Sequence, residues 1–168
     1  KPEDLEAAQS LVDLGTALGC VDKAVAILED QLDDIRDSRI RLSRLLQLGD
    51  LYHRTLKDLD EAEGAYERAL EIDAECGEAL DGLLRVAIDD ERFDKQLAAL
   101  ERKQIITKIP EDKKTILVEM GRIWETEIGD ASRSVSIYQR VLELLPADSD
   151  ALVALSRLYE ELSNHAAL

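Results

Sequence analysis

The chain has few of the residues that interrupt helices and few of those that favour strands. Its 168 residues include 8 glycines and 3 prolines, and aromatic residues make up only 4%. Leucine, alanine and glutamate dominate instead, and they lose little conformational freedom on entering a helix. No alternating strand pattern flanks an Asn-Gly or Asp-Gly pair, so nothing indicates a β-hairpin. The composition therefore favours helix over strand.

Basic residues are also scarce: 21 lysines and arginines stand against 37 acidic residues, a net charge of −16. A phosphate backbone needs a basic footprint, so no nucleic-acid partner is expected. No apolar run approaches the roughly 20 residues that span a bilayer, so no membrane insertion is expected. The two cysteines, Cys20 and Cys76, form neither a zinc motif nor a CxxC pair. They suit a reducing compartment, and we expect a cytoplasmic protein.

Signals for catalysis are missing as well. The two histidines, His53 and His165, have no metal-ligand spacing, and His53 is most simply a solvated or groove-lining residue. The HExxH, phosphate-loop, GxSxG and dinucleotide-binding motifs are absent. The many carboxylates fit solvated helix faces. We therefore predict no enzymatic activity, no catalytic residues, no cofactor and no metal site.

Apolar residues recur along the chain at steps of three and four residues. This spacing is typical of an amphipathic helix that packs on one face. Short breaks between the periodic segments indicate antiparallel neighbours. The pattern predicts nine helices, at about 4–18, 21–35, 38–56, 59–72, 77–89, 92–108, 112–128, 131–145 and 148–163.

The breaks contain residues that end and begin helices. Gly19 and Gly129 stand where a helix end favours a left-handed backbone. Asp58 and Asp130 are expected to cap the helices that follow them. Prolines in "IPEDKK" (109–114) and "LPADSD" (145–150) follow helix ends, with Asp or Ser ready to cap the next helix.

The sequence repeats itself at an offset of 72 residues. "LLQLGDLY" (45–52) falls on "LVEMGRIW" (117–124), and Tyr66 falls on Tyr138. Half of this offset is a helix pair of about 36 residues. One apolar slot on successive first helices holds Leu45, Leu80, Leu117 and Leu152, and an aromatic-or-Ala slot holds Tyr52, Ala87, Trp124 and Tyr159.

Small residues between these slots have a packing role. Gly49, Gly121 and Ser156 would let a neighbouring helix approach closely, despite the cost of about 1 kcal/mol for a glycine within a helix. The second helix of the pair supplies the reciprocal residues, such as Tyr66.

This pattern resembles the tetratricopeptide repeat family. The stretches "LLQLGDLYHRTLKDLDEAEGAYERALEIDA" and "MGRIWETEIGDASRSVSIYQRVLELLP" carry the resemblance, well over about 42–163 and weakly over 3–36. Both have one extra residue between the aromatic and the second helix. The resemblance implies an all-α fold, a right-handed superhelical solenoid of about four and a half repeats over residues 1–168. Its expected pairs are 3–36, 38–73, 77–109 and 112–146, followed by a lone helix at 148–163.

The resemblance also implies binding of a protein or peptide on the concave face, which the first helix of each pair lines. Arg85, Arg122 and Arg157 occupy matched places and could form a ladder for an acidic peptide. The alternative is an ordinary polar face with pairs within one helix, such as Arg157 with Glu161. The candidate binding residues are Asp50, His53, Arg54, Arg85, Arg122, Glu125, Arg157 and Glu160.

A second class of function stays open, a structural spacer or self-associating scaffold segment. The last predicted helix, 148–163, lacks a partner helix, which suggests a fragment of a longer chain. Exposed apolar residues on a terminal repeat could form a homo-oligomer.

Overall fold

The structure is a computed structural model that describes residues 5–165, and all the regular secondary structure in this range is helical. The prediction of an all-α helical-repeat fold is confirmed. The helices are α1 (Leu5–Leu18), α2 (Val21–Asp30), α3 (Ser38–Leu51), α4 (Leu59–Ile72), α5 (Gly77–Asp89), α6 (Phe93–Ile106), α7 (Pro110–Arg122), α8 (Ala131–Leu144) and α9 (Ser149–His165).

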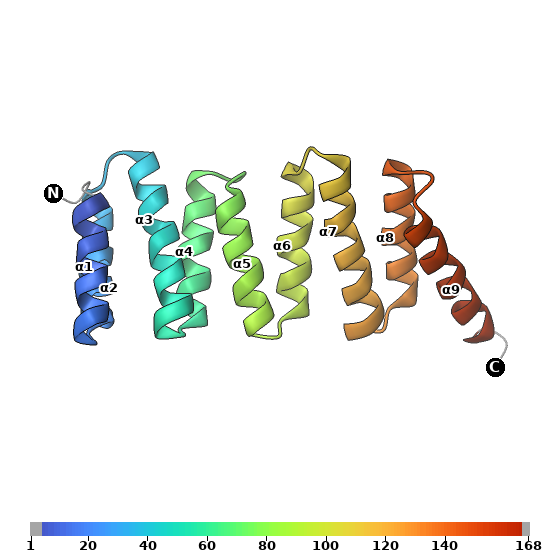
Figure 1. Cartoon of the computed structure of the whole chain (residues 1–168), viewed down its shortest axis with the longest axis horizontal. Helices are drawn as coiled ribbons and strands as arrows, with labels where there is room; N and C mark the ends of the chain where they lie inside the picture. The colour runs from blue at the N-terminus through green and yellow to red at the C-terminus, as the bar shows by residue number, and fades with distance from the viewer. Residues whose placement is uncertain (1–4, 166–168) are drawn as a thin grey trace. The chain divides into compact units, whose positions relative to one another are not determined.

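The chain divides into two compact units, Lys1–Asp90 and Glu91–Leu168. In unit 1, α1 packs on α2, and α4 lies between α3 and α5 (Figure 1). In unit 2, α7 packs on both α6 and α8, and α8 packs on α9. The division falls inside the expected pair 77–109, because α5 belongs to unit 1 and α6 to unit 2. A single continuous solenoid, with the expected pair boundaries, stays a prediction.

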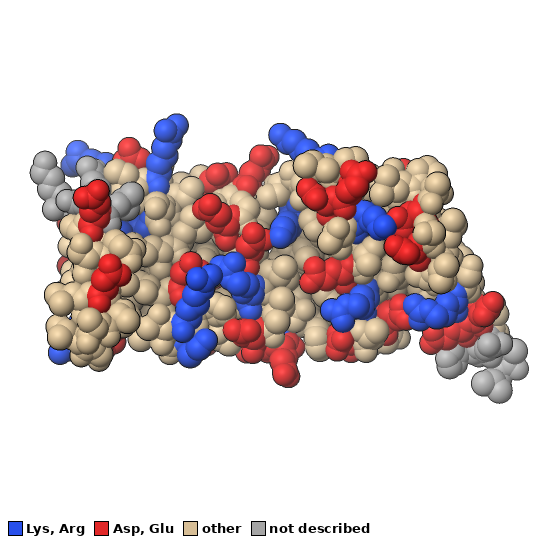
Figure 2. Space-filling view, viewed as in Figure 1, with Lys and Arg blue, Asp and Glu red and all other residues tan. Residues whose placement is uncertain are grey.

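The negative charge is concentrated in unit 1. Residues 1–90 contain 23 acidic and 10 basic residues, whereas residues 91–168 contain 14 and 11. Unit 1 therefore carries −13 of the net −16. On the face of unit 1 visible in Figure 2, basic side chains lie among acidic ones and form no separate patch. This interspersed pattern suits ion pairs between helices better than a phosphate backbone.

The predicted caps are present. The Asp58 carboxylate accepts a hydrogen bond from the Glu61 amide at 3.2 Å, and Asp130 accepts one from the Arg133 amide at 3.0 Å. Gly19 and Gly129 have φ angles of 66° and 77°, in the left-handed region that a glycine adopts without strain.

Pro110 and Pro146 take different positions relative to helices α7 and α9. Asp148, two residues after Pro146, caps α9 by accepting from the Ala151 amide at 2.9 Å, as predicted. Pro110 is instead the first residue of α7, and no side chain caps that helix. Proline suits this position, because the first helical amide has no partner within the helix.

The extra residue in each of the two best repeats is taken up by a π-helical turn. Helix α3 continues into η2 (Tyr52–Leu56), and α7 continues into η3 (Ile123–Glu127). The same hydrogen bond follows both turns: the Asp58 amide donates to the Tyr52 carbonyl at 3.0 Å, and the Asp130 amide to the Trp124 carbonyl at 2.7 Å. A π turn holds one residue more than an α turn. The next helix therefore starts in the same place relative to its aromatic residue in both units.

The helix predicted over 21–35 is shorter in the structure. Helix α2 ends at Asp30, a 3₁₀ turn η1 follows at Leu32–Asp34, and Ile35 is extended. Carboxylates at Asp33 and Asp34 would stand at the negative end of a longer helix, which is unfavourable. Leu32 and Ile35 are nevertheless buried in the core. The apolar spacing that suggested a helix is therefore compatible with a 3₁₀ turn followed by an extended residue.

The predicted apolar slot is buried in three helices and open in α9. Leu45, Leu80 and Leu117 are buried, but Leu152 is 48% exposed and Tyr159 is 47% exposed. Leu152 therefore differs from the other three members of the slot in being exposed. Helix α8 packs on α9 from the other side, where Ala151, Leu155 and Leu158 are buried.

Candidate functional site

The Tyr66 ring joins three helices of unit 1. It projects from α4 and is fully buried against two glycines, Gly49 on α3 and Gly82 on α5. A Cβ atom would lie 2.6 Å from the ring at Gly49 and 2.4 Å at Gly82, too close for either position to hold a larger residue without a shift. The role of Gly49 was predicted, whereas that of Gly82 was missed.

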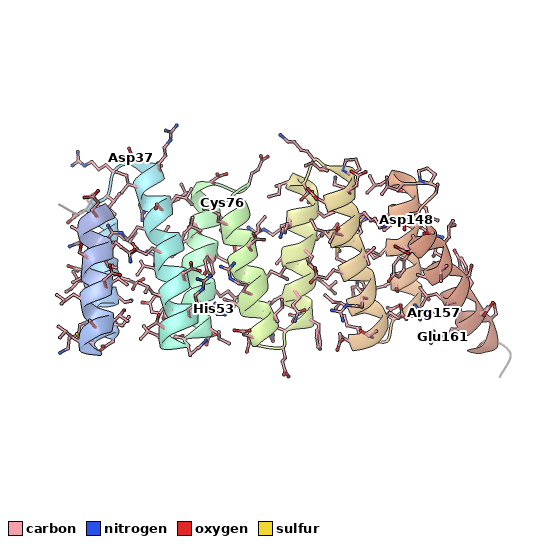
Figure 3. The ribbon with its side chains drawn as sticks, in the orientation of Figure 1. Asp37, His53, Cys76, Asp148, Arg157 and Glu161 are labelled. Atoms are coloured by element: carbon pink, nitrogen blue, oxygen red, sulfur yellow. The ribbon has the colours of Figure 1, made fainter. Side chains whose placement is uncertain are left out.

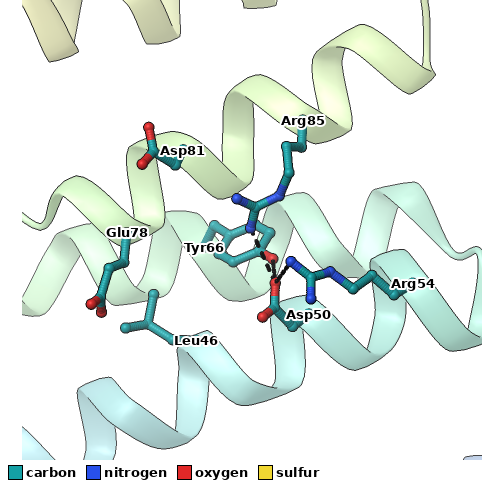
Figure 4. A pocket seen from close by; sticks show the side chains of 7 residues that line it. All are labelled: Leu46, Asp50, Arg54, Tyr66, Glu78, Asp81 and Arg85. Carbon is teal, nitrogen blue, oxygen red and sulfur yellow. Dashed lines mark hydrogen bonds and ion pairs between the residues drawn. The ribbon is translucent and has the colours of Figure 1, made fainter.

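The Tyr66 hydroxyl organises a polar cluster at the surface between α3 and α5 (Figure 4). It donates a hydrogen bond of 2.7 Å to Asp50 Oδ1, and Arg85 Nη2 donates to the same oxygen at 3.1 Å. Arg54 Nη2 lies 3.9 Å from it. Three of the predicted binding residues, Asp50, Arg54 and Arg85, are therefore brought together, although they come from α3, η2 and α5.

Burial and charge fix the protonation of this cluster. Burial raises the pKa of Tyr66 to about 12, and the hydrogen bond to Asp50 adds to the effect. Burial alone would lower the pKa of Arg85, but Tyr66 and Asp50 outweigh it, and the net shift is upward. At neutral pH the phenol is therefore a donor and the guanidinium is charged.

These groups line a pocket of about 250 Å³. Arg54 and Arg85 stand toward one end of it, and Glu78 and Asp81 stand toward the other (Figure 4). The pocket thus has a basic end and an acidic end. Its lining residues are Leu46, Asp50, Arg54, Tyr66, Glu78, Asp81 and Arg85.

His53 is not solvated, contrary to the simplest interpretation of the sequence. The side chain lies on η2 within unit 1 and is only 6% exposed (Figure 3). Its Nε2 atom lies 2.8 Å from Asp89 Oδ2 on α5. His53 therefore ties η2 to α5 beside the pocket. The spacing of apolar residues along one helix does not reveal this contact, because Asp89 lies on another helix, 36 residues away.

The other predicted binding residues lie in unit 2. Arg157 on α9 forms a two-pronged ion pair with Glu125 on η3, in which Nη2 and Oε2 are 3.0 Å apart. Glu161 adds only a longer-range contribution to the raised pKa of Arg157, so the main partner lies on another helix. Arg122 and Glu160 are exposed. A ladder of Arg85, Arg122 and Arg157 stays a prediction, because Arg85 belongs to the other unit.

Two further features were missed by sequence reasoning. Arg44 on α3 is fully buried, and burial lowers the pKa of its guanidinium. Arg44 is a charged residue in a helix whose polar and apolar residues are not cleanly separated, so nothing in the sequence indicated that it is buried.

The second missed feature is an ion pair that recurs between second helices. Arg68 on α4 contacts Glu29 on α2, with 3.4 Å between Nη1 and Oε1. Arg140 on α8 contacts Glu101 on α6, with 3.2 Å between Nη2 and Oε1. Both partners are displaced by the 72-residue offset, so an extended self-alignment could have found the pair.

Among residues 5–165, no cluster of His, Cys, Asp and Glu could hold a metal ion. Within the same range no helix has the length and apolar character needed to cross a bilayer.

Paired helices that recur with the same caps, the same π turns and the same Tyr–Gly contact define a helical-repeat protein. Residues 42–76 match the family model described as tetratricopeptide repeat. The match covers 35 of the 168 residues, and this segment is therefore a tetratricopeptide repeat. Repeats of this family generally mediate protein–protein interaction and are typically non-enzymatic.

Two curated relatives are similar to most of the chain. Superkiller complex protein 3 of Mus musculus is 29% identical over 158 residues, which are 93% of this chain and 10% of that protein. The protein of the same name from Homo sapiens is 28% identical over 148 residues, 87% of this chain and 9% of that one. The chain therefore spans about a tenth of the length of these relatives.

A solved structure supports the fold independently. The crystal structure of MamA superposes with a TM-score of 0.55 over 90% of this chain and 84% of that chain. The two sequences are 16% identical, so this likeness concerns the fold alone.

Proposed function

We propose that the chain is a non-enzymatic module that binds a protein or peptide partner on the face lined by the first helices of its pairs. In unit 1, α3 and α5 are two of these first helices. The observation that carries the proposal is the pocket between them, into which charged groups from α3, η2 and α5 converge. Tyr66 packs closely against both helices and sets their spacing at the pocket, which favours binding without rearrangement.

The relatives support a role inside an assembly. Both are named as a protein of the superkiller complex. A segment that resembles a tenth of such a protein would bind one neighbouring protein in a larger complex. This role requires a binding surface and no catalytic site. A cytoplasmic location is part of this proposal, and the free thiols Cys20 and Cys76 agree with it.

The experiment is affinity capture from an extract with the chain as bait, followed by crosslinking of the captured protein. Leu46→Trp fills the pocket with a larger side chain at a half-buried position. Leu14→Trp, at an exposed leucine on α1, is the matched control. We expect Leu46→Trp to lose the partner that the native chain and Leu14→Trp retain. A partner held equally by all three would place binding outside this pocket.

A self-associating scaffold is the second candidate, because α9 exposes Leu152, Val153 and Tyr159. Sedimentation at increasing concentration tests it. If this face assembles copies of the chain, Val153→Lys will reduce the average mass, whereas a monomer at every concentration excludes this function.

A further inference from the structure

We propose that the pocket between α3 and α5 selects a partner segment that carries one acidic and one basic side chain close together. The carboxylate would bind at Arg54 and Arg85, and the cation at Glu78. This inference rests on the proposed function and adds the chemistry of the partner. A short segment suffices, because the pocket measures about 250 Å³.

The basic end keeps donors for a ligand. Each guanidinium has five N–H donors, and both arginines share a single oxygen, Asp50 Oδ1. Arg85 is fixed by its 3.1 Å contact, whereas Arg54 is 3.9 Å away with a side chain that is 62% exposed. A ligand carboxylate can therefore add to the arginines without displacing Asp50. Paired donors of this kind bind carboxylates in two-pronged geometry.

The acidic end of the pocket lies at the start of α5. Glu78 stands in the first turn of this helix and is exposed. In the part of the chain that the structure describes, Glu78 has no ion pair. Asp81 lies one turn further along and also lines the pocket, and its negative charge contributes to the raised pKa of Arg85. A lysine or arginine of the partner would pair with Glu78.

The two ends together disfavour partners of one charge. A purely acidic segment would meet Glu78 and Asp81 as well as the −13 net charge of unit 1. A purely basic segment would meet Arg54 and Arg85. Like charges at this separation are unfavourable, so discrimination comes from repulsion as much as from attraction. The acidic peptide predicted from the sequence took only the arginines into account.

The test is a nuclear magnetic resonance titration with three capped nonapeptides of glycine and serine. The first carries one Glu and one Arg separated by a single residue, the second carries two Glu, and the third carries two Arg. We expect the bipolar peptide to shift the resonances of pocket residues and to bind about tenfold more tightly than either other peptide, the effect of one lost charge-assisted contact.

Variants assign each end. Arg54→Gln and Glu78→Gln change exposed residues and should each reduce the affinity for the bipolar peptide about tenfold. Glu71→Gln, at an exposed position on α4 outside the pocket, should have no effect.

Equal binding of the three peptides, tightest binding of the two-Glu peptide, or no shift of pocket resonances would each overturn the bipolar assignment. These failures differ from failure of the proposed function, which is shown by Leu46→Trp retaining its captured partner.

Discussion

The ring of Tyr66 on α4 occupies the space above Gly82 on α5, where a Cβ atom would lie 2.4 Å from Cε1 and Cζ. The same tyrosine also packs on α3 and donates a hydrogen bond to the Asp50 carboxylate in the pocket. The size of one side chain on α5 therefore controls the spacing of the two helices that form the candidate site.

Gly82→Ala should destabilise unit 1. Overpacking costs about 1–3 kcal/mol, and the better helix propensity of alanine offsets about 1 kcal/mol of it. We expect a net loss of up to about 2 kcal/mol, measured by hydrogen exchange of the α4 and α5 amides. Gly64→Ala on α4 is the control, because no atom lies within 4 Å of its added Cβ. Gly64→Ala should be slightly stabilising, and equal stability of the two variants would show that Tyr66 moves aside freely.

Alkaline pH should weaken unit 1 through Tyr66. The pKa of this phenol is about 12 in the folded chain, against an ordinary value of 10.0, so the folded state retains a proton that the unfolded state loses. The stabilisation is complete below pH 10 and is lost as the pH rises from 10 to 12, by about 2–3 kcal/mol in total. Absorbance at the phenolate band, recorded with helix content, follows both events.

Tyr66→Phe provides the comparison for this titration. It should remove one late-titrating phenol and make the loss of stability above pH 10 smaller, with Tyr52, whose pKa is also about 12, still contributing. Tyr159→Phe lies in unit 2 and should leave the alkaline loss of unit 1 unchanged. An unchanged profile in Tyr66→Phe would refute the assignment.

The sequence predicted the helices and their ends well, because these depend on local chemistry. Caps at Asp58 and Asp130 and left-handed glycines follow from nearest neighbours. The extra residue of the two best repeats was visible against the usual length of the repeat, and two π turns accommodate it. The helix end at Asp30 was missed because Leu32 and Ile35 kept the apolar spacing of a helix while being buried by a turn.

The site was only half predictable, for a different reason. Asp50, Arg54 and Arg85 were chosen as exposed groups of a groove, but the sequence did not indicate that Asp50 binds Arg85. Their contact depends on the spacing between α3 and α5, which Gly82 sets. Burial of His53 has the same origin, since only the approach of α5 brings Asp89 to it.

A cation–π contact should stabilise unit 2 measurably. The Arg133 guanidinium carbon lies 4.4 Å from the centre of the Trp124 ring, and Trp124 is the one tryptophan of the chain. Its fluorescence therefore reports on this unit alone. Arg133→Gln should cost about 0.5–1 kcal/mol and shift the emission to longer wavelength as water reaches the ring. Arg122→Gln, an exposed arginine without this contact, should do neither, and identical spectra for the two variants would contradict the assignment.

The recurring ion pair between second helices should be stronger in unit 2 than in unit 1. Arg140 reaches both oxygens of Glu101 and also donates to Gln104 at 2.6 Å, whereas Arg68 makes a single 3.4 Å contact with Glu29. Double-mutant cycles with glutamine substitutions should give a coupling energy near 1 kcal/mol for the first pair and about 0.2–0.5 kcal/mol for the second. Because all four side chains are partly exposed, molar salt should reduce both values. Equal coupling in both pairs would show that the extra contacts of Arg140 add nothing, and coupling that is insensitive to salt would show that packing rather than charge joins these helices.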